Sequence, residues 1–240
     1  MNCLIWRLYK NESLGGRSYC PQCRHQLAWY DNIPLVSFVV LGGRCRYCRQ
    51  PISWQYPLVE LATGFLFLLS FWLHQQTGEL NGLVLARDWL VFSVMIVVFV
   101  FDWRWYLIPA GLVLPASGVV FLLSWLLGFS WKNLLISGII GSSFFLIQWV
   151  ISRGKWIGSG DAYLGWLIGI ALGWPYVLGA IFFSYWLGAL AALGLLASGR
   201  KKLKSQLPLG VFLSIGTIVF LLWGRDIFDW WFGLWAVGYF

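Results

Sequence analysis

Long apolar blocks fill most of the chain after residue 55, and short polar stretches separate them. They predict membrane-spanning helices over 57–73, 84–101, 108–127, 133–151, 162–173, 175–197 and 207–223. Several reach the roughly 17–25 residues that a helix needs to cross a bilayer core about 30 Å thick. The pattern therefore predicts an all-α polytopic membrane protein with about seven transmembrane helices.

The block 162–173 is the shortest of the seven. As a helix it would rise only ~18 Å. Gly173-Trp174-Pro175 then ends it, because proline cannot continue a helix and the glycine favours a turn. Its length is compatible with a short span in a thinned region or with a re-entrant helix.

The first 55 residues are organised differently. Residues 1–9 are apolar but too short to cross, and we interpret them as the remnant of a first transmembrane helix. Residues 10–55 are polar and carry four of the five cysteines. The expected organisation is a 1–9 remnant, a small zinc-ribbon-like insert at 10–55 and a membrane domain at 56–240.

Composition supports a membrane location. Apolar residues make up 60% of the chain and charged residues 11%, against roughly 25% charged in a soluble domain. The 18 tryptophans suit a protein with two lipid–water interfaces. On such a protein, the net charge of +8 is explained by basic cytoplasmic loops, so it does not indicate nucleic-acid binding.

The basic residues also predict the topology. If residues 10–55 are cytoplasmic and all seven blocks cross, 14 of the 17 Lys and Arg lie on the cytoplasmic side, including the cluster at 200–204. The exceptions are Arg87, Lys132 and Arg225. Cytoplasmic loops are enriched in Lys and Arg, so this distribution favours seven crossings.

Two Cys-x-x-Cys pairs lie in the polar segment, Cys20 with Cys23 and Cys45 with Cys48. Each pair offers two thiolates from one tight turn, and two such turns complete a tetrahedral Cys₄ shell for zinc. A closed shell leaves no position for substrate, so the metal would be structural. The alternative is a pair of disulfides, which the basic, cytoplasm-like composition of the segment disfavours.

Asp102 and Asp161 are the candidate catalytic residues. Asp102 ends the block 84–101, and Asp161 follows Gly158-Ser159-Gly160 just before the block 162–173. Two crossings separate them, so both acids return to the same membrane face. The glycines permit close approach of another segment. The alternatives are that Asp161 is an N-cap and that Asp102 pairs with Arg104.

Two carboxylates at close range share a proton, because ionising both is costly. One can then act as a base toward water while the other donates a proton to a carbonyl oxygen. This is the chemistry of peptide hydrolysis without a nucleophilic side chain. A non-enzymatic alternative is a membrane-anchored zinc module, or a transporter in which the acids bind a proton or cation.

An ordered set of motifs resembles one known family, the type IV prepilin peptidases. The matching stretches are Arg17-Ser-Tyr-Cys-Pro-Gln-Cys23, Trp29-Tyr-Asp-Asn-Ile-Pro-Leu35, Gly43-Arg-Cys-Arg-Tyr-Cys48, Tyr56-Pro-Leu-Val-Glu60, Phe101-Asp102, Ile108-Pro109, Gly158-Ser-Gly-Asp161 and Leu207-Pro-Leu-Gly210. Gly-x-Gly-Asp is the family's own signature. A lone copy would be weak, but the ordered set is specific.

The resemblance implies that Asp102 and Asp161 are catalytic, that Gly158, Gly160 and Pro109 shape the site, and that Leu207–Gly210 lies near it. It implies prepilin or pseudopilin precursors as substrates, cut at the cytoplasmic face of the bacterial inner membrane. Many members also methylate the new amino terminus with S-adenosylmethionine. The lipid bilayer and the precursors are thus the expected partners.

Overall fold

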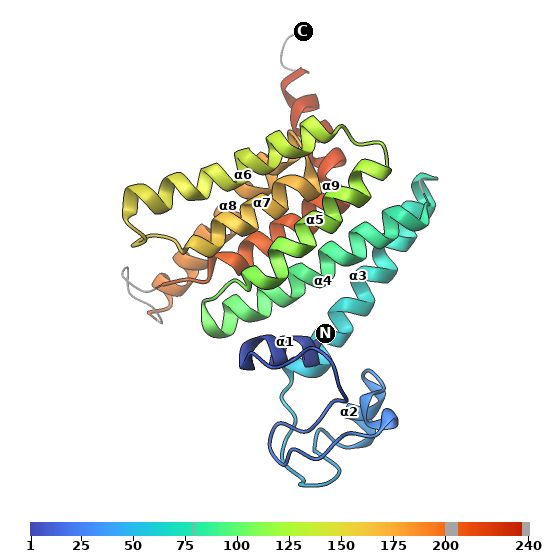
Figure 1. Cartoon of the computed structure of the whole chain (residues 1–240). Coiled ribbons are helices and arrows are strands. Elements are labelled where there is room, and N and C mark those ends of the chain that lie inside the picture. Colours follow the sequence, from blue (N-terminus) through green and yellow to red (C-terminus); the bar gives the residue numbers. More distant parts are fainter. Residues whose placement is uncertain (79, 200–205, 237–240) are drawn as a thin grey trace. The chain divides into compact units, whose positions relative to one another are not determined.

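The computed structural model describes residues 1–78, 80–199 and 206–236, and helices dominate it (Figure 1). The basic cluster at 200–204 lies outside the described residues. The elements are α1 (Asn2–Lys10), the 3₁₀ helix η1 (Trp29–Asn32), α2 (Val36–Val40), α3 (Gln55–Thr77), α4 (Gly82–Trp105), α5 (Ala110–Leu126), α6 (Trp131–Ser152), α7 (Ser159–Leu172), α8 (Tyr176–Ala197) and α9 (Leu209–Ala236). Each of the seven predicted apolar blocks forms one helix, α3 to α9.

The chain forms two compact units, Met1–Leu69 and Ser70–Phe240, and the boundary falls within α3. In the first unit, the buried Arg7 of α1 organises the loop that follows. Its guanidinium donates to the carbonyl oxygens of Leu14, Gly15 and Arg17 at 2.7, 2.5 and 2.9 Å. Three carbonyl acceptors satisfy a buried cation that would otherwise be costly.

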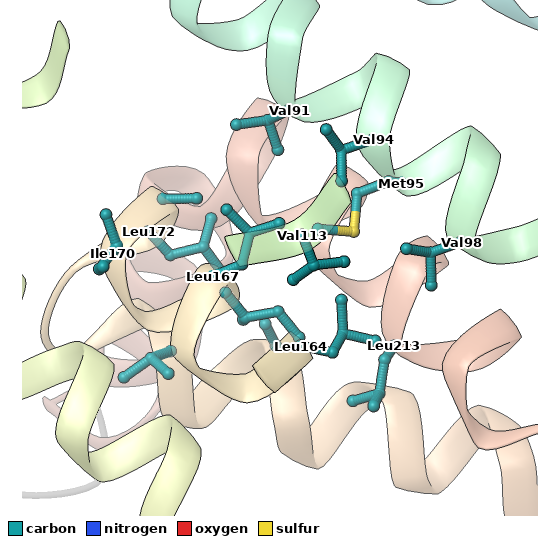
Figure 2. Packing of buried hydrophobic residues seen from close by; sticks show 14 of the residues in the cluster. Val91, Val94, Met95, Val98, Val113, Leu164, Leu167, Ile170, Leu172 and Leu213 are labelled. Carbon is teal, nitrogen blue, oxygen red and sulfur yellow. The ribbon is translucent and has the colours of Figure 1, made fainter. Parts of the chain in front are cut away.

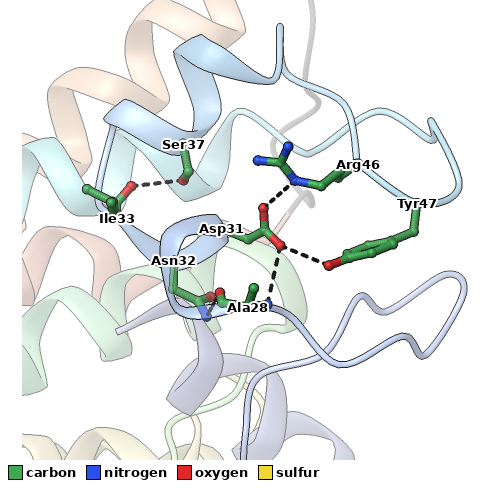
Figure 3. A network of polar contacts seen from close by, with 7 residues as sticks. All are labelled: Ala28, Asp31, Asn32, Ile33, Ser37, Arg46 and Tyr47. Carbon is green, nitrogen blue, oxygen red and sulfur yellow. Dashed lines mark hydrogen bonds and ion pairs between the residues drawn. The ribbon is translucent and has the colours of Figure 1, made fainter.

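Asp31 is the centre of a second polar network in this unit (Figure 3). Its carboxylate accepts from Arg46 Nε at 2.8 Å, from Tyr47 Oη at 3.4 Å and from the Ala28 amide at 3.3 Å. The Asp31 side chain is only 2% exposed, so these donors offset the cost of burying its charge. The network ties η1 to the segment around the second cysteine pair.

Helices α4 to α9 build the second unit around one apolar core (Figure 2). The core side chains include Val91, Val94, Met95 and Val98 of α4, Val113 of α5, Leu164, Leu167 and Ile170 of α7, and Leu213 of α9. Helix α7 is central, because α5, α6, α8 and α9 all pack against it. Its 14 residues rise ~21 Å, and most of them are buried.

Small residues allow α6 and α7 to approach closely. A side chain at Gly141 would collide with the Gly165 carbonyl oxygen, and one at Gly169 with that of Ser137. A Cβ on Gly138 would lie 3.0 Å from the Trp166 ring. Gly138 and Gly141 thus permit this close helix packing. Helices in lipid associate largely through such van der Waals contact.

Five helices are long and apolar enough to cross a membrane: α3, α4, α6, α8 and the Leu209–Trp231 part of α9. Helices α5 and α7 are apolar but shorter. The break after α7 is confirmed: the helix ends at Leu172, and Gly173 adopts φ 73°. The Trp174 amide donates to Asn133 Oδ1 at 3.0 Å, which fixes this turn against the start of α6.

Candidate functional site

Asp102 lies in the last turn of α4 and faces the beginning of α9. Its Oδ2 accepts a hydrogen bond from the Val211 amide at 3.2 Å. A Cβ on Gly210 would lie 2.9 Å from the same oxygen, so the α9 backbone approaches the carboxylate as only glycine permits. Gly210, the last residue of the stretch Leu207–Gly210, therefore lies beside Asp102.

Asp161 is the third residue of α7. Its Oδ2 accepts from the Gly158 amide at 3.0 Å, and Gly158 is the N-cap of the helix. The alternative that Asp161 itself is the N-cap is wrong, because its side chain reaches back to an amide that precedes the helix. Like Asp102, it is 6% exposed.

Gly160 explains how the two chain regions meet. A Cβ at this position would lie 2.9 Å from Cβ of Ile108, in the connection between α4 and α5. The start of α7 thus packs directly against the segment that follows Asp102. Pro109 comes next and is the N-cap of α5. Gly158 is less constrained, since the nearest atom to its Cβ position is Asp161 Oδ2 at 3.8 Å.

The structure brings the two aspartates together from α4 and α7. The two helices share neighbours, because α4 and α7 both pack against α5 and against α9. Each carboxylate accepts a hydrogen bond from a backbone amide at the start of a helix. This helix is α9 for Asp102 and α7 for Asp161. Helix N-termini favour negative charge. The arrangement can hold one shared proton between two acids, as general acid–base chemistry on water requires.

Gln148 and Tyr185 are polar residues near this site that the motif reasoning missed. Tyr185 Oη of α8 donates to Gln148 Oε1 of α6 at 3.1 Å. The Tyr185 ring stacks on Phe145, whose ring limits the space at Gly165, one turn beyond Asp161. Polar residues inside apolar blocks are a signal that could have identified both.

The four cysteines form a second candidate site, in the first unit. Cys20, Cys23, Cys45 and Cys48 place their Sγ atoms within 4.8 Å of one another. All five cysteines of the chain are free thiols, so the predicted alternative of two disulfides is not found. His25 does not join the cluster; its ring stacks on Tyr47 at 3.6 Å.

The two cysteine turns repeat one backbone pattern. In the first turn, the Cys20 amide donates to the His25 carbonyl and the Arg24 amide donates to the Cys20 carbonyl. Tyr19 and Gln26 form a β-bridge at its base. In the second turn, the Cys45 amide donates to the Gln50 carbonyl and the Arg49 amide donates to the Cys45 carbonyl. Arg44 and Pro51 form the matching β-bridge. Arg24 and Arg49 both have positive φ, 58° and 60°. The repeat presents two thiols from each turn to a common centre.

The thiol geometry fits a tetrahedral metal. Zinc–sulfur bonds of ~2.3 Å imply sulfurs ~3.8 Å apart, and Cys20 Sγ lies 3.9 Å from Cys48 Sγ. Burial raises the pKa of Cys45, but the amides of Cys48 and Tyr47 outweigh it and lower the pKa to about 7. Burial raises the pKa of Cys20. A donor set of four thiols in this spacing suits Zn²⁺.

Comparison with protein families gives two matches that together cover most of the chain. Residues 1–74 match the model of the bacterial peptidase A24 N-terminal domain. Residues 89–193 match the model of the type IV leader peptidase family. The first match contains the cysteine cluster, and the second contains both aspartates.

Several curated proteins named prepilin leader peptidase/N-methyltransferase are similar to this chain. One from Klebsiella pneumoniae is 38% identical over 65% of this chain and 69% of its own length. One from Aeromonas hydrophila is 33% identical over 89% of this chain and 74% of its own. A Myxococcus xanthus protein is 35% identical over 83% of this chain, which spans 60% of that relative. No solved structure matches significantly.

Proposed function

The chain belongs to the type IV leader peptidase family, and from this we propose that it is a membrane-embedded aspartic endopeptidase. Its substrates are prepilin or pseudopilin precursors, from which it removes the short leader. The observation that supports the proposal is that Asp102 accepts a hydrogen bond from the start of α9, while Asp161 lies at the start of α7, which packs against α9.

The two aspartates act on one water molecule. The ionised carboxylate takes a proton from the water as its oxygen attacks the scissile carbonyl carbon, and the protonated one donates to the carbonyl oxygen. The tetrahedral intermediate then collapses: the C–N bond breaks and the leaving amine takes up a proton from the pair. Both carboxyl groups accept a hydrogen bond from a backbone amide at a helix N-terminus. The helix dipoles therefore do not by themselves decide which aspartate is the base and which is the proton donor.

In the proposed topology all seven helices α3 to α9 cross the bilayer, with α5 and α7 as short spans. Helix α7 tolerates its length because neighbouring helices surround it. Two crossings, α5 and α6, return the chain from Asp102 to Asp161 on one face. The positive-inside bias makes this the cytoplasmic face of the bacterial inner membrane.

The domain roles follow the same division. Residues 10–55 would form a cytoplasmic zinc-binding insert, and 56–240 the peptidase domain. Zinc held by Cys20, Cys23, Cys45 and Cys48 would cross-link the two turns and fix the fold of the insert. The N-methyltransferase activity in the relatives' names extends to this chain as a proposal, with S-adenosylmethionine as methyl donor.

The test is incubation of the membrane-reconstituted protein with a prepilin and S-adenosylmethionine, with both products followed by mass. The expected result is loss of the leader and a gain of one methyl group. Asp102→Asn and Asp161→Asn should each lower cleavage by at least about 10³-fold, the scale of general acid–base catalysis. Zinc content and membrane levels serve as the folding controls. Normal cleavage by either variant contradicts the assignment.

The transporter and zinc-module alternatives predict another outcome. A transporter would carry ions across the reconstituted membrane and release no leader peptide, and an anchored zinc module would do neither. Both family matches are to peptidase models, and nothing in the comparisons favours these alternatives.

A further inference from the structure

An apolar surface of the first unit is exposed. It consists of Val36, Val39 and Val40 of α2, here called the valine surface, and Val39 and Val40 are 76% and 72% exposed. Trp54, just before α3, is also exposed. Contiguous exposed apolar side chains of this kind mark an interaction surface.

The valine surface is held against the start of α3 by specific contacts. The Leu35 amide, at the N-cap of α2, donates to Glu60 Oε2 at 2.9 Å. Leu35 has φ 61°, a conformation unfavourable for a leucine, so the contact compensates local strain. The Phe38 and Trp54 rings also pack, with centroids 5.2 Å apart.

Glu60 fixes how far along α3 the valine surface lies. Glu60 is the sixth residue of α3, which places it ~7.5 Å from the first residue of the helix. Helix α3 is one of the five helices apolar and long enough to cross a membrane. Leu35, which directly precedes the valine surface, is thus held at the first turns of α3. If α3 crosses the bilayer, those turns lie near a lipid–water interface. Exposed tryptophans such as Trp54 are typical of that depth.

The charge of the first unit suits the same surroundings. Met1–Leu69 contains seven Lys and Arg and three Asp and Glu, a net charge of +4. Arg44 and Arg49, which follow the valine surface in the chain, are exposed. Basic residues next to exposed apolar side chains are the combination that binds anionic lipid.

We propose that α2 is an in-plane membrane anchor, in which the valine surface inserts among the headgroups of anionic lipid beside α3. Glu60 is the latch that holds it at that depth. The anchor would fix the cysteine-bearing unit against the bilayer by a contact separate from the transmembrane helices. It does not depend on the peptidase proposal.

The test places a photo-crosslinking amino acid, benzoylphenylalanine, at position 39 or 40 of the full chain in phosphatidylglycerol nanodiscs. Position 22 is the control, because Gln22 is also exposed but lies in the first cysteine turn. Lipid adducts at 39 and 40, and none at 22, are expected. Adducts only to a second copy, only to an added prepilin, or to nothing would overturn the proposal.

The latch has its own matched pair of variants. Glu60→Gln keeps an acceptor oxygen for the Leu35 amide, whereas Glu60→Leu removes it. Lipid labelling at position 39 should persist in Glu60→Gln and be lost in Glu60→Leu. Unchanged labelling in Glu60→Leu would overturn the latch. The Asp102→Asn protein should label like wild type, which keeps this result separate from the peptidase assignment.

Discussion

The cysteine cluster and the aspartate pair are built in opposite ways. Each cysteine turn is made by a few consecutive residues, and the same backbone hydrogen bonds appear in both. The aspartate pair needs α4, the connection to α5, and the starts of α7 and α9, which are far apart in sequence. One site is locally encoded and the other depends on the packing of the whole bundle.

This difference predicts where each site is vulnerable. The cysteine site depends on its ligands, because the turns are held by main-chain contacts that most substitutions leave intact. The aspartate site depends equally on residues with no chemistry of their own, such as Gly160 and Gly210, where another chain segment leaves no room for a Cβ. The variants below should separate these two kinds of dependence, starting with the largest effect on cleavage.

Gly160→Ala should have the largest effect among residues that carry no functional group. Its Cβ would lie 2.9 Å from Ile108 Cβ, a rigid part of that side chain, so α7 must shift. A displacement approaching 1 Å lowers catalysis by about 10²-fold. Gly158→Ala is the matched control, because its Cβ would meet no atom closer than Asp161 Oδ2 at 3.8 Å. Equal cleavage rates of the two variants would contradict the packing argument.

Gly210→Ala should have a smaller effect. The new methyl group would lie 2.9 Å from Asp102 Oδ2, but a carboxylate can rotate away more easily than a helix can move. We expect cleavage to fall about tenfold, less than for a misplaced backbone. Gly118→Ala in α5, with nothing within 4 Å, is the control and should cleave normally. A normal rate for Gly210→Ala would show that this close approach does not position Asp102.

Replacing Cys20 and Cys45 by serine should affect cleavage least. Elemental analysis should find about one zinc per wild-type chain, as one Cys₄ shell implies, and none in the double variant. Cleavage should persist, since the cluster lies in the other unit. Cys3→Ser, outside the cluster, is the control. Wild-type protein without zinc would refute the metal assignment, and loss of cleavage would show that the two sites are coupled.

Much of this architecture could be predicted from the sequence. Length and apolarity identified α3 to α9, because a bilayer demands long uninterrupted apolar helices. The Cys-x-x-Cys spacing identified the cluster, because each turn is local. Counting the crossings between Asp102 and Asp161 predicts that they lie on one face of the membrane, and their pairing stays a prediction that the variants test.

Contacts between distant segments could not be predicted in the same way. No sequence pattern links the Val211 amide to Asp102 or Ile108 to Gly160, since both depend on how helices pack in three dimensions. The apolar pattern places Glu60 inside the block 57–73, but it could not specify the Leu35 amide as its partner. The predicted block begins at residue 162, whereas α7 begins three residues earlier, at Ser159. Gly158 takes the N-cap position.

The most direct test of the aspartate pair compares Asp102→Asn, Asp161→Asn and the double variant for prepilin cleavage in one membrane preparation. If the two carboxyl groups act as one unit on a shared proton, each single variant should be as inactive as the double variant. If instead the fold-losses in cleavage rate of the two single variants multiply in the double variant, the two residues do not work as a pair. Normal cleavage by one single variant would lead to the same conclusion.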